Sequence, residues 1–260
     1  MRVLKKFFLI LIFTAVVALA AGRLWLLPKY VVPIMMYHNV DYVETPEPNT
    51  VSPERFDWQM KYLKDRKYNV ISLNELVNAI REERSLPRNS VVITFDDGPE
   101  NNYTYAFKIL KKYNFPAIIF MPSRFVDTAK FLKSAQIKEM LSKGISIGSH
   151  TQTHDYLPDL SREKQVEEIV KSKAELENKF DISVRYFAYP VGGFSEEIKD
   201  IVKQAGYKAA VATNRGYDRF NKDVYELNRV RFSDKDDRID YMFIKLSGYY
   251  NLFRKSKSPY

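Results

Sequence analysis

From residue 31 onward, short apolar runs rich in β-branched and aromatic residues alternate with amphipathic stretches, and this alternation constrains the fold most. The apolar runs have the length and composition of buried β-strands; they cover residues 31–37, 70–73, 91–95, 117–121, 145–149, 186–189, 208–213 and 228–232. The stretches between them have helical periodicity and helical end signals; they include residues 52–63, 75–83 (with Asn74 as the expected cap), 135–143, 161–179 and 195–205.

Strands that alternate with helices predict parallel strands joined by crossover helices. Seven to eight such units in one domain indicate an α/β barrel, whose functional residues gather where the strands end. A doubly wound open sheet is the alternative. No glycine-rich phosphate-binding motif follows a predicted strand, so the sequence gives no support for a bound nucleotide.

The composition excludes several classes of protein. With 45% hydrophobic and 28% charged residues, the chain can build a globular core and is not a disordered polymer. It contains no cysteine, so disulfides, thiolate metal sites and cysteine nucleophiles are excluded. The net charge is +9, to which Arg2, Lys5 and Lys6 contribute three. The remaining body is mildly basic, which suits an anionic envelope or lipid surface better than nucleic acid.

The N-terminus predicts export. Residues 1–6 are basic, residues 7–21 carry no charge, and the apolar run ends in small residues at 18–21. This is the pattern of a secretory signal. A second apolar stretch at 24–27 makes an uncleaved membrane anchor the alternative. We therefore expect a signal or anchor over residues 1–27, one domain over 28–240 and a basic, aromatic tail over 241–260, which contacts either a membrane surface or the domain itself.

Two motifs follow predicted strands and could bind a metal ion. Adjacent carboxylates at Asp96 and Asp97 repel each other unless a cation holds them, although a plain turn would also explain them. His150 and His154 are two of only three histidines, and on one helical turn they would face the same side. One carboxylate and two imidazoles form a metal site with open positions for water, typical of catalytic metals.

Two further segments end predicted strands. His38, the third histidine, follows the first strand of the body, and it is either a structural residue or a proton-transfer residue. A Gly-rich turn at 190–193 follows the strand at 186–189 and allows a ligand to approach the backbone closely. A backbone N–H there could face a developing oxyanion.

With these motifs the chain resembles the polysaccharide deacetylases of carbohydrate esterase family four, the NodB-homology domain, over roughly residues 31–232. TFDDG at 94–98 and HTQTH at 150–154 match the first two motifs of this family in the right order. The resemblance implies a distorted (β/α) barrel that uses a divalent metal ion, usually zinc, to hydrolyse N-acetyl groups of glycans. It assigns metal binding to Asp97, His150 and His154, the general base to Asp96 and an oxyanion-binding N–H to Val191.

The chain departs from the family pattern in two ways. Ala188 stands where the third motif often has arginine, so Asp96 must be braced by another residue, for which Arg185 and Arg229 are candidates. No histidine follows His154, so the late histidine that many members use as general acid is missing. The MMYHNV segment at 35–40 is similar to one in the branch that includes biofilm poly-N-acetylglucosamine deacetylases, and this similarity implies that His38 is the acid.

The expected function is therefore metal-dependent removal of N-acetyl groups from an N-acetylglucosamine-containing glycan of the cell envelope. The alternatives are hydrolysis of acetyl esters on a polysaccharide and a glycan-binding module of the same fold without catalysis. Zinc is the expected metal ion, and the ligand set would also accept cobalt, nickel or iron. The expected partner is an acetylated glycan, with contact to a membrane surface and with neither nucleic acid nor nucleotide.

Overall fold

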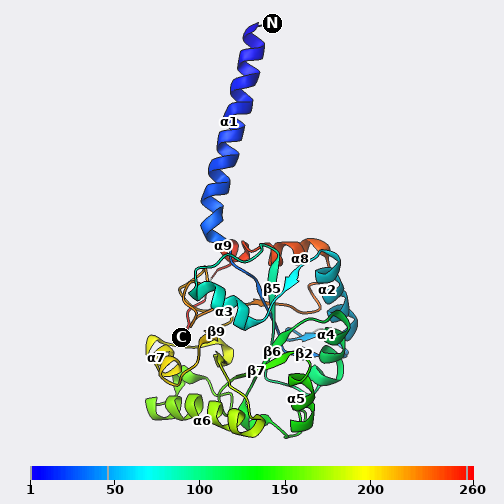
Figure 1. The fold of residues 1–260 in the computed structure, drawn as a ribbon, viewed down its shortest axis with the longest axis vertical. Coiled ribbons are helices and arrows are strands. Elements are labelled where there is room, and N and C mark those ends of the chain that lie inside the picture. Colours follow the sequence, from blue (N-terminus) through cyan, green and yellow to red (C-terminus); the bar gives the residue numbers. More distant parts are fainter. Residues whose placement is uncertain (1, 46, 256) are drawn as a thin grey trace.

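The computed structural model describes residues 2–45, 47–255 and 257–260, and a long helix projects from a rounded body (Figure 1). This helix, α1, runs over Arg2–Leu26, and a short 3₁₀ turn over Leu27–Lys29 connects it to the body. Twenty-five residues give a helix about 37 Å long, enough to cross the hydrocarbon core of a bilayer. In the described part of the chain, α1 is the one helix that is long and apolar enough to span a membrane.

The body is built on an eight-stranded parallel sheet in the order β10-β1-β5-β6-β7-β8-β9, with β4 paired to β5 beside this path. The strands are β1 (Ile34–Tyr37), β4 (Asn69–Val70), β5 (Ser90–Asp96), β6 (Ala117–Met121), β7 (Ile145–Ser149), β8 (Tyr186–Ala188), β9 (Ala209–Val211) and β10 (Val230–Arg231). A short pair, β2 (Asn39–Val40) and β3 (Thr50–Val51), lies outside this sheet. The predicted parallel α/β architecture is confirmed.

The sheet curves into a distorted barrel, because the segment before β10 hydrogen-bonds to β9. The Ala212 N–H donates to the Leu227 carbonyl at 2.8 Å, and the Arg229 N–H donates to the Thr213 carbonyl at 2.9 Å. The chain then continues into β10, which pairs with β1. The two ends of the sheet are thereby linked, and the C-terminal ends of the strands surround a common mouth.

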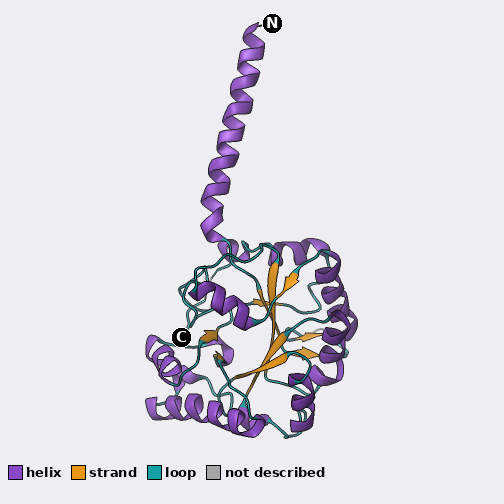
Figure 2. Ribbon diagram, viewed as in Figure 1, coloured by secondary structure: helices purple, strands orange, loops and turns teal. Residues whose placement is uncertain are grey.

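Helices surround the strands (Figure 2). The α-helices of the body are α2 (Pro53–Asp65), α3 (Leu73–Arg81), α4 (Lys108–Tyr113), α5 (Ser134–Leu141), α6 (Arg162–Phe180), α7 (Glu196–Gln204), α8 (Ile239–Leu246) and α9 (Tyr250–Phe253). A π-helical segment, Asn102–Phe107, precedes α4, and 3₁₀ turns lie at Ser123–Phe125, Leu157–Asp159 and Pro190–Gly192. Most of these helices connect one parallel strand to the next, as the alternation in the sequence predicts.

Two details of the helices differ from the expectation. The expected cap Asn74 lies inside α3, and Ser72 caps this helix instead, its Oγ accepting the Glu75 N–H at 3.1 Å. The helical stretch Asn102–Tyr113 was not predicted. It starts without a side-chain cap and in a π-helical conformation, so the signals that mark a helix start are missing there.

The alternation of side chains along β5 positions the first functional residue. Val91, Ile93 and Phe95 belong to the large core between the strands and the helices, whereas Val92 belongs to a smaller core inside the barrel. Because side chains alternate along a strand, Asp96 falls on the inner side with Val92. Because Asp96 is also the last residue of β5, its carboxylate lies at the mouth of the barrel.

The C-terminal residues are part of the body. In α8, Met242 and Leu246 are buried, and the Gly248 carbonyl accepts the Val31 N–H at 2.8 Å, next to the foot of α1. The Phe194 N–H donates to the carbonyl of Pro259 at 2.9 Å. The boundary we expected at residues 240 and 241 falls inside α8.

Candidate metal centre and its cleft

The two adjacent aspartates at the end of β5 point to different partners because the chain turns between them. Asp96 is the last residue of the strand, and Asp97 has a φ of 68°, in the left-handed region that few non-glycine residues adopt. Gly98 follows with a φ of 65°, and a Cβ there would lie 2.8 Å from the Met121 side chain. The local conformation thus separates two carboxylates that are neighbours in sequence.

Asp96 is held by Arg229, one of the two arginines that the sequence leaves open. The two terminal guanidinium nitrogens donate to Oδ1 and Oδ2 of Asp96, both at 2.6 Å. Arg229 is itself 1% exposed, and its Nε donates to the carbonyl of Ala212 at 2.8 Å. The other candidate, Arg185, is exposed on the surface. Arg229 therefore takes the position of the brace that the sequence motif lacks.

Burial alone would raise the pKa of Asp96, but its charged neighbours outweigh this effect. The Arg229 charge, the nearby His150 and the hydrogen bonds from Arg229 together hold the pKa of Asp96 well below its usual range. Asp96 is therefore ionised at every working pH. It is an anion with a fixed orientation at the mouth of the barrel.

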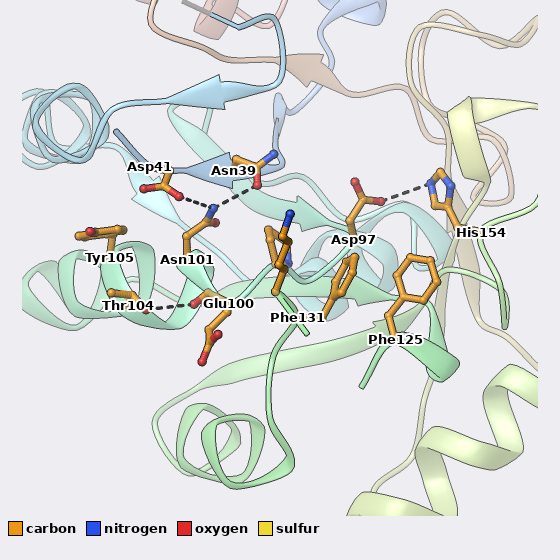
Figure 3. Close-up of a pocket in the computed structure, with 12 residues that line it drawn as sticks. Asn39, Asp41, Asp97, Glu100, Asn101, Thr104, Tyr105, Phe125, Phe131 and His154 are labelled. Atoms are coloured by element: carbon orange, nitrogen blue, oxygen red, sulfur yellow. Dashed lines mark hydrogen bonds and ion pairs between the residues drawn. The ribbon is translucent and has the colours of Figure 1, made fainter. Parts of the chain in front are cut away.

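Asp97, His150 and His154 converge, although they come from two different strand ends. Asp97 Oδ1 lies 3.6 Å from His150 Nε2 and 3.3 Å from His154 Nε2, and the three ligand atoms lie within 4.8 Å of one another. The Asp97–His154 pair borders a cleft (Figure 3). The structure thus brings together the three residues expected to bind the metal ion.

The protonation of these residues fits a metal ion. His150 Nδ1 lies 2.7 Å from the Ala188 carbonyl, which fixes the ring proton on Nδ1 and leaves the Nε2 lone pair facing Asp97. Burial lowers the pKa of His150 to about 4, so this ring is neutral at pH 7. Asp97 Oδ1 is buried and makes no hydrogen bond to any described residue. A cation between these acceptor atoms would satisfy them.

The local conformation of the two histidines differs from the expectation. We expected both on one helical turn, but residues 150–154 form a loop in which Thr151 and His154 each have a φ of 66°. The two imidazole rings still come within 4.7 Å, centroid to centroid. The His154 N–H donates to Thr151 Oγ1 at 3.0 Å, a bond that tightens the loop.

Glu168 of α6 holds this histidine loop, and the sequence did not single it out. Its Oε2 accepts the backbone N–H groups of Gln152 at 2.8 Å and of Thr153 at 3.0 Å, and its Oε1 accepts the Thr153 hydroxyl at 3.0 Å. Glu168 is only 6% exposed. A carboxylate on the mainly apolar inner face of the helix at 161–179 was the signal available in the sequence.

His38 follows β1 and lies on the Asp96 side of the site. Its Nε2 is 4.0 Å from Asp96 Oδ2, and its buried Nδ1 has no hydrogen-bond partner among the described residues. Burial lowers the pKa of His38, an effect that Asp96 and Asp97 partly oppose and that Arg229 and Arg231 reinforce. The ring is thus close to the carboxylate that Arg229 holds.

The Gly-rich turn after β8 lies at the same edge of the sheet. Val191 has a φ of 57°, its side chain is 54% exposed, and its carbonyl accepts Arg215 Nε at 3.1 Å. Gly192 packs against Thr213, where a Cβ would come within 3 Å of both Thr213 side-chain and backbone atoms. The backbone of the turn is therefore tightly held next to the end of β9.

A cleft of about 670 Å³ opens beside the three metal-binding candidates (Figure 3). Its lining combines carboxylates, amides and aromatic rings: Asn39, Asp41, Asp97, Pro99, Glu100, Asn101, Thr104, Tyr105, Phe125, Lys130, Phe131 and His154. The Asn101 side chain donates to Asn39 Oδ1 at 3.1 Å and to Asp41 Oδ2 at 3.2 Å, which fixes one wall. Aromatic faces and ordered polar groups are suited to a sugar ring.

Comparison with known proteins gives a consistent result. Residues 83–210 match the family profile described as polysaccharide deacetylase. The Bacillus subtilis protein YxkH, whose name places it among the polysaccharide deacetylases, is 34% identical over 201 residues, which cover 77% of this chain and 71% of YxkH. A poly-beta-1,6-N-acetyl-D-glucosamine N-deacetylase of Staphylococcus aureus is 28% identical over 217 residues, 77% of this chain and 73% of that protein.

Among solved structures, the Streptococcus pyogenes deacetylase PplD, in complex with acetate, superimposes with a TM-score of 0.74 at 28% identity. The match covers 87% of this chain and 98% of PplD. The similarity therefore includes nearly the whole body of the present chain.

Proposed function

The chain belongs to the polysaccharide deacetylase family, and from this membership we propose that it is a metal-dependent hydrolase that removes N-acetyl groups from an N-acetylglucosamine-containing glycan of the cell envelope. One observation carries the proposal. Asp97, His150 and His154 converge beside Asp96; Asp97 and His154 line the cleft, and His150 is buried.

Asp97, His150 and His154 would hold the metal ion. A divalent metal ion bound there would polarise the acetyl carbonyl and lower the pKa of a water molecule. Zinc suits a site with one carboxylate and two imidazoles, and cobalt, nickel and iron are the other candidates. The unpartnered Asp97 Oδ1 and the Nε2 lone pair of His150 support this assignment.

Asp96 and His38 are proposed as the two proton-transfer residues. Asp96 accepts the proton of the attacking water, and Arg229 keeps this carboxylate ionised and oriented for the task. His38 gives a proton to the nitrogen of the departing glucosamine. His38 Nε2 lies 4.0 Å from Asp96 Oδ2, which supports the two side chains acting in the same site. The Val191 N–H is proposed to stabilise the oxyanion.

The substrate class follows from relatives and from the cleft. The S. aureus relative is named for a glycan of N-acetylglucosamine, and 28% identity over 77% of this chain supports a similar substrate. Phe125, Phe131 and Tyr105 could contact the faces of sugar rings, and Asn39 and Asn101 could bond hydroxyl groups.

The test is acetate release from N-acetylglucosamine oligomers, compared with acetylated xylan. The protein is stripped of metal with a chelator and then restored with zinc. Zinc-dependent release from the oligomers supports the proposal. Zinc-dependent release from xylan alone would show an ester hydrolase, and zinc binding with no release from either substrate would favour a glycan-binding module.

We also propose that the protein is exported and that α1 anchors it in the membrane. The helix is continuous over Arg2–Leu26 and is exposed along its described side chains, as a membrane-embedded segment would be. Mass spectrometry of the protein from membranes tests this. An intact N-terminus supports the anchor, and a new terminus near residue 22 would show that α1 is a cleaved signal.

A membrane contact of the body is proposed at α8 and α9, close to the foot of α1. Tyr30 follows this foot, and its ring lies 5.7 Å, centroid to centroid, from that of Tyr249, which is between α8 and α9 in the chain. Phe243, Ile244 and Phe253 are exposed there by 50% or more. Exposed apolar side chains among lysines and arginines suit the interface of an anionic bilayer.

A further inference from the structure

A second cavity, of about 280 Å³, lies between the ends of β9 and β10 and the C-terminal helices. Five cationic residues line it, although the side chain of Arg229 is itself buried: Arg229, Arg231, Lys245, Arg254 and Lys257. Thr213 and Asn214 add polar groups. Neither the metal centre nor the proposed proton transfers account for this concentration of positive charge.

Only part of this charge is neutralised within the described residues. Arg229 is paired with Asp96, and Lys245 Nζ lies 2.5 Å from Asp236 Oδ1. Arg254 donates instead to backbone carbonyls, those of Arg229 at 2.9 Å and Thr213 at 3.5 Å. No described carboxylate lies within ion-pair distance of Arg231, Arg254 or Lys257. Three cations thus share one concave surface without a counter-ion.

Each positive group makes the protonated form of its neighbours less favourable. Burial and the neighbouring Arg231, partly opposed by Tyr250, together lower the pKa of Arg254 to about 10. Burial also lowers the pKa of Lys245, with Arg254 and Arg231 acting in the same direction. A bound anion would relieve this repulsion, because its charge would be shared by all of these groups.

We propose that this cavity binds a phosphate group carried by the glycan substrate. Two arginine side chains and one lysine without acidic partners offer more donors than a single carboxylate can accept, and phosphate has the oxygens to match them. The cavity also adjoins the catalytic residues. Arg229 lines it and binds Asp96, and Thr213 lines it and contacts Gly192 of the oxyanion turn. The inference rests on the proposed function, because it concerns the substrate of that same site.

The first test measures binding of inorganic phosphate to the full chain in a neutral detergent by isothermal titration calorimetry, with and without a chelator. Binding that persists with the chelator does not involve a bound metal ion. The test variant is Arg231→Gln/Lys257→Gln, and the matched control is Arg185→Gln/Lys143→Gln, an equal charge change at exposed residues outside the cavity. We expect phosphate affinity to fall by about tenfold or more in the test variant and to stay unchanged in the control.

The second test compares kcat/KM for N-acetylglucosamine 1-phosphate with that for a neutral N-acetylglucosamine trimer. The test variant should lose turnover of the phosphorylated sugar selectively, with turnover of the trimer retained. Phosphate binding that is equal in the test and control variants would overturn the proposal. Binding to vesicles of anionic phospholipid through Arg231 and Lys257, with no effect on the sugar phosphate, would overturn it in favour of a lipid headgroup. Calorimetry measures phosphate binding without any turnover. A protein that binds phosphate but releases no acetate would therefore contradict the deacetylase proposal and not the phosphate site.

Discussion

Asp96 and Asp97 are covalent neighbours, and they have opposite electrostatic surroundings. Asp96 faces the buried guanidinium of Arg229. Asp97 faces the imidazoles of His150 and His154, and the three side chains could bind one cation together. The left-handed backbone at Asp97 makes this division possible. One short motif can therefore supply both a fixed anion for proton transfer and a metal ligand.

At the residue scale, Arg229→Met should destabilise the fold strongly. The substitution leaves the Asp96 carboxylate buried without its partner, which typically costs about 3–5 kcal/mol. The free energy of unfolding in urea measures this, with Arg185→Met as an exposed control expected to change little.

The stability lost in Arg229→Met should depend on pH in a definite direction. Because folding lowers the pKa of Asp96, the pair contributes stability that is fully present above the unfolded value of about 3.8 and is lost as the pH falls through the folded value. The difference between the two proteins should thus shrink in acid. An equal difference at pH 3 and pH 7 would contradict this account.

His38→Gln should lower kcat by roughly 10²–10⁴-fold with zinc still bound, because it removes a proposed acid and no metal ligand. His38 must be protonated to act, and burial lowers its pKa, so wild-type kcat/KM should decline as the pH rises through that pKa. This decline should be missing from the residual activity of the variant. Full activity in the variant across the pH range would rule out the acid role.

How much of the site the sequence could predict depends on the residue. The three metal-binding candidates were predictable because each sits in a short motif directly after a strand. The sequence could not predict that Arg229, and not Arg185, binds Asp96. That choice depends on which side chain near a distant strand faces the barrel mouth. Glu168 was missed because a carboxylate on the inner face of a helix does not reveal its partners, which are mainly backbone N–H groups.

At the element scale, most strands of the main sheet were predictable because they are buried apolar runs between helices, whereas the short strands β2 and β3 outside it were not predicted. The histidine loop was not predictable either, because two positive φ angles, at Thr151 and His154, replace the regular turn that i, i+4 spacing suggests. Side-chain bonds such as that of Thr151 to the His154 N–H stabilise this irregular path.

Glu168→Ala should weaken zinc binding by about 10–100-fold, because it frees the loop that orients both histidines. Chelator competition measures the zinc affinity. Glu167→Ala is the matched control on the same helix, where Glu167 only pairs with Lys164 and Lys171 at the surface. Unchanged zinc affinity in Glu168→Ala would show that the loop holds its shape without this carboxylate.

At the scale of the whole molecule, α1 and the barrel are linked through the C-terminal helices. The Val31 N–H bonds the Gly248 carbonyl just after the foot of α1, so α8 and α9 cannot lie far from the membrane if α1 spans it. The amphipathic tail was visible in the sequence. The sequence left open whether it packs on the body or contacts a membrane, because its contacts include one with a residue more than 200 positions earlier, that of Gly248 with Val31.

Phe243→Ser/Ile244→Ser should reduce flotation of residues 28–260 with anionic liposomes severalfold. The double substitution removes two exposed apolar side chains from the proposed membrane contact, and the buried face of α8 with Met242 and Leu246 is kept. Tyr217→Ser changes an exposed aromatic residue outside this helix and serves as the control. Flotation that is equal in all three proteins would exclude α8 as the contact.

The most direct test of the account is acetate release from N-acetylglucosamine oligomers by wild-type protein and Asp96→Asn, each with its zinc content measured. We predict zinc-dependent release by the wild type, and a loss of roughly 10²–10⁴-fold in Asp96→Asn at unchanged zinc content. Asp97→Ala, measured alongside, should lose the zinc itself. Full acetate release by Asp96→Asn, or release by wild type that does not depend on zinc, would contradict the account.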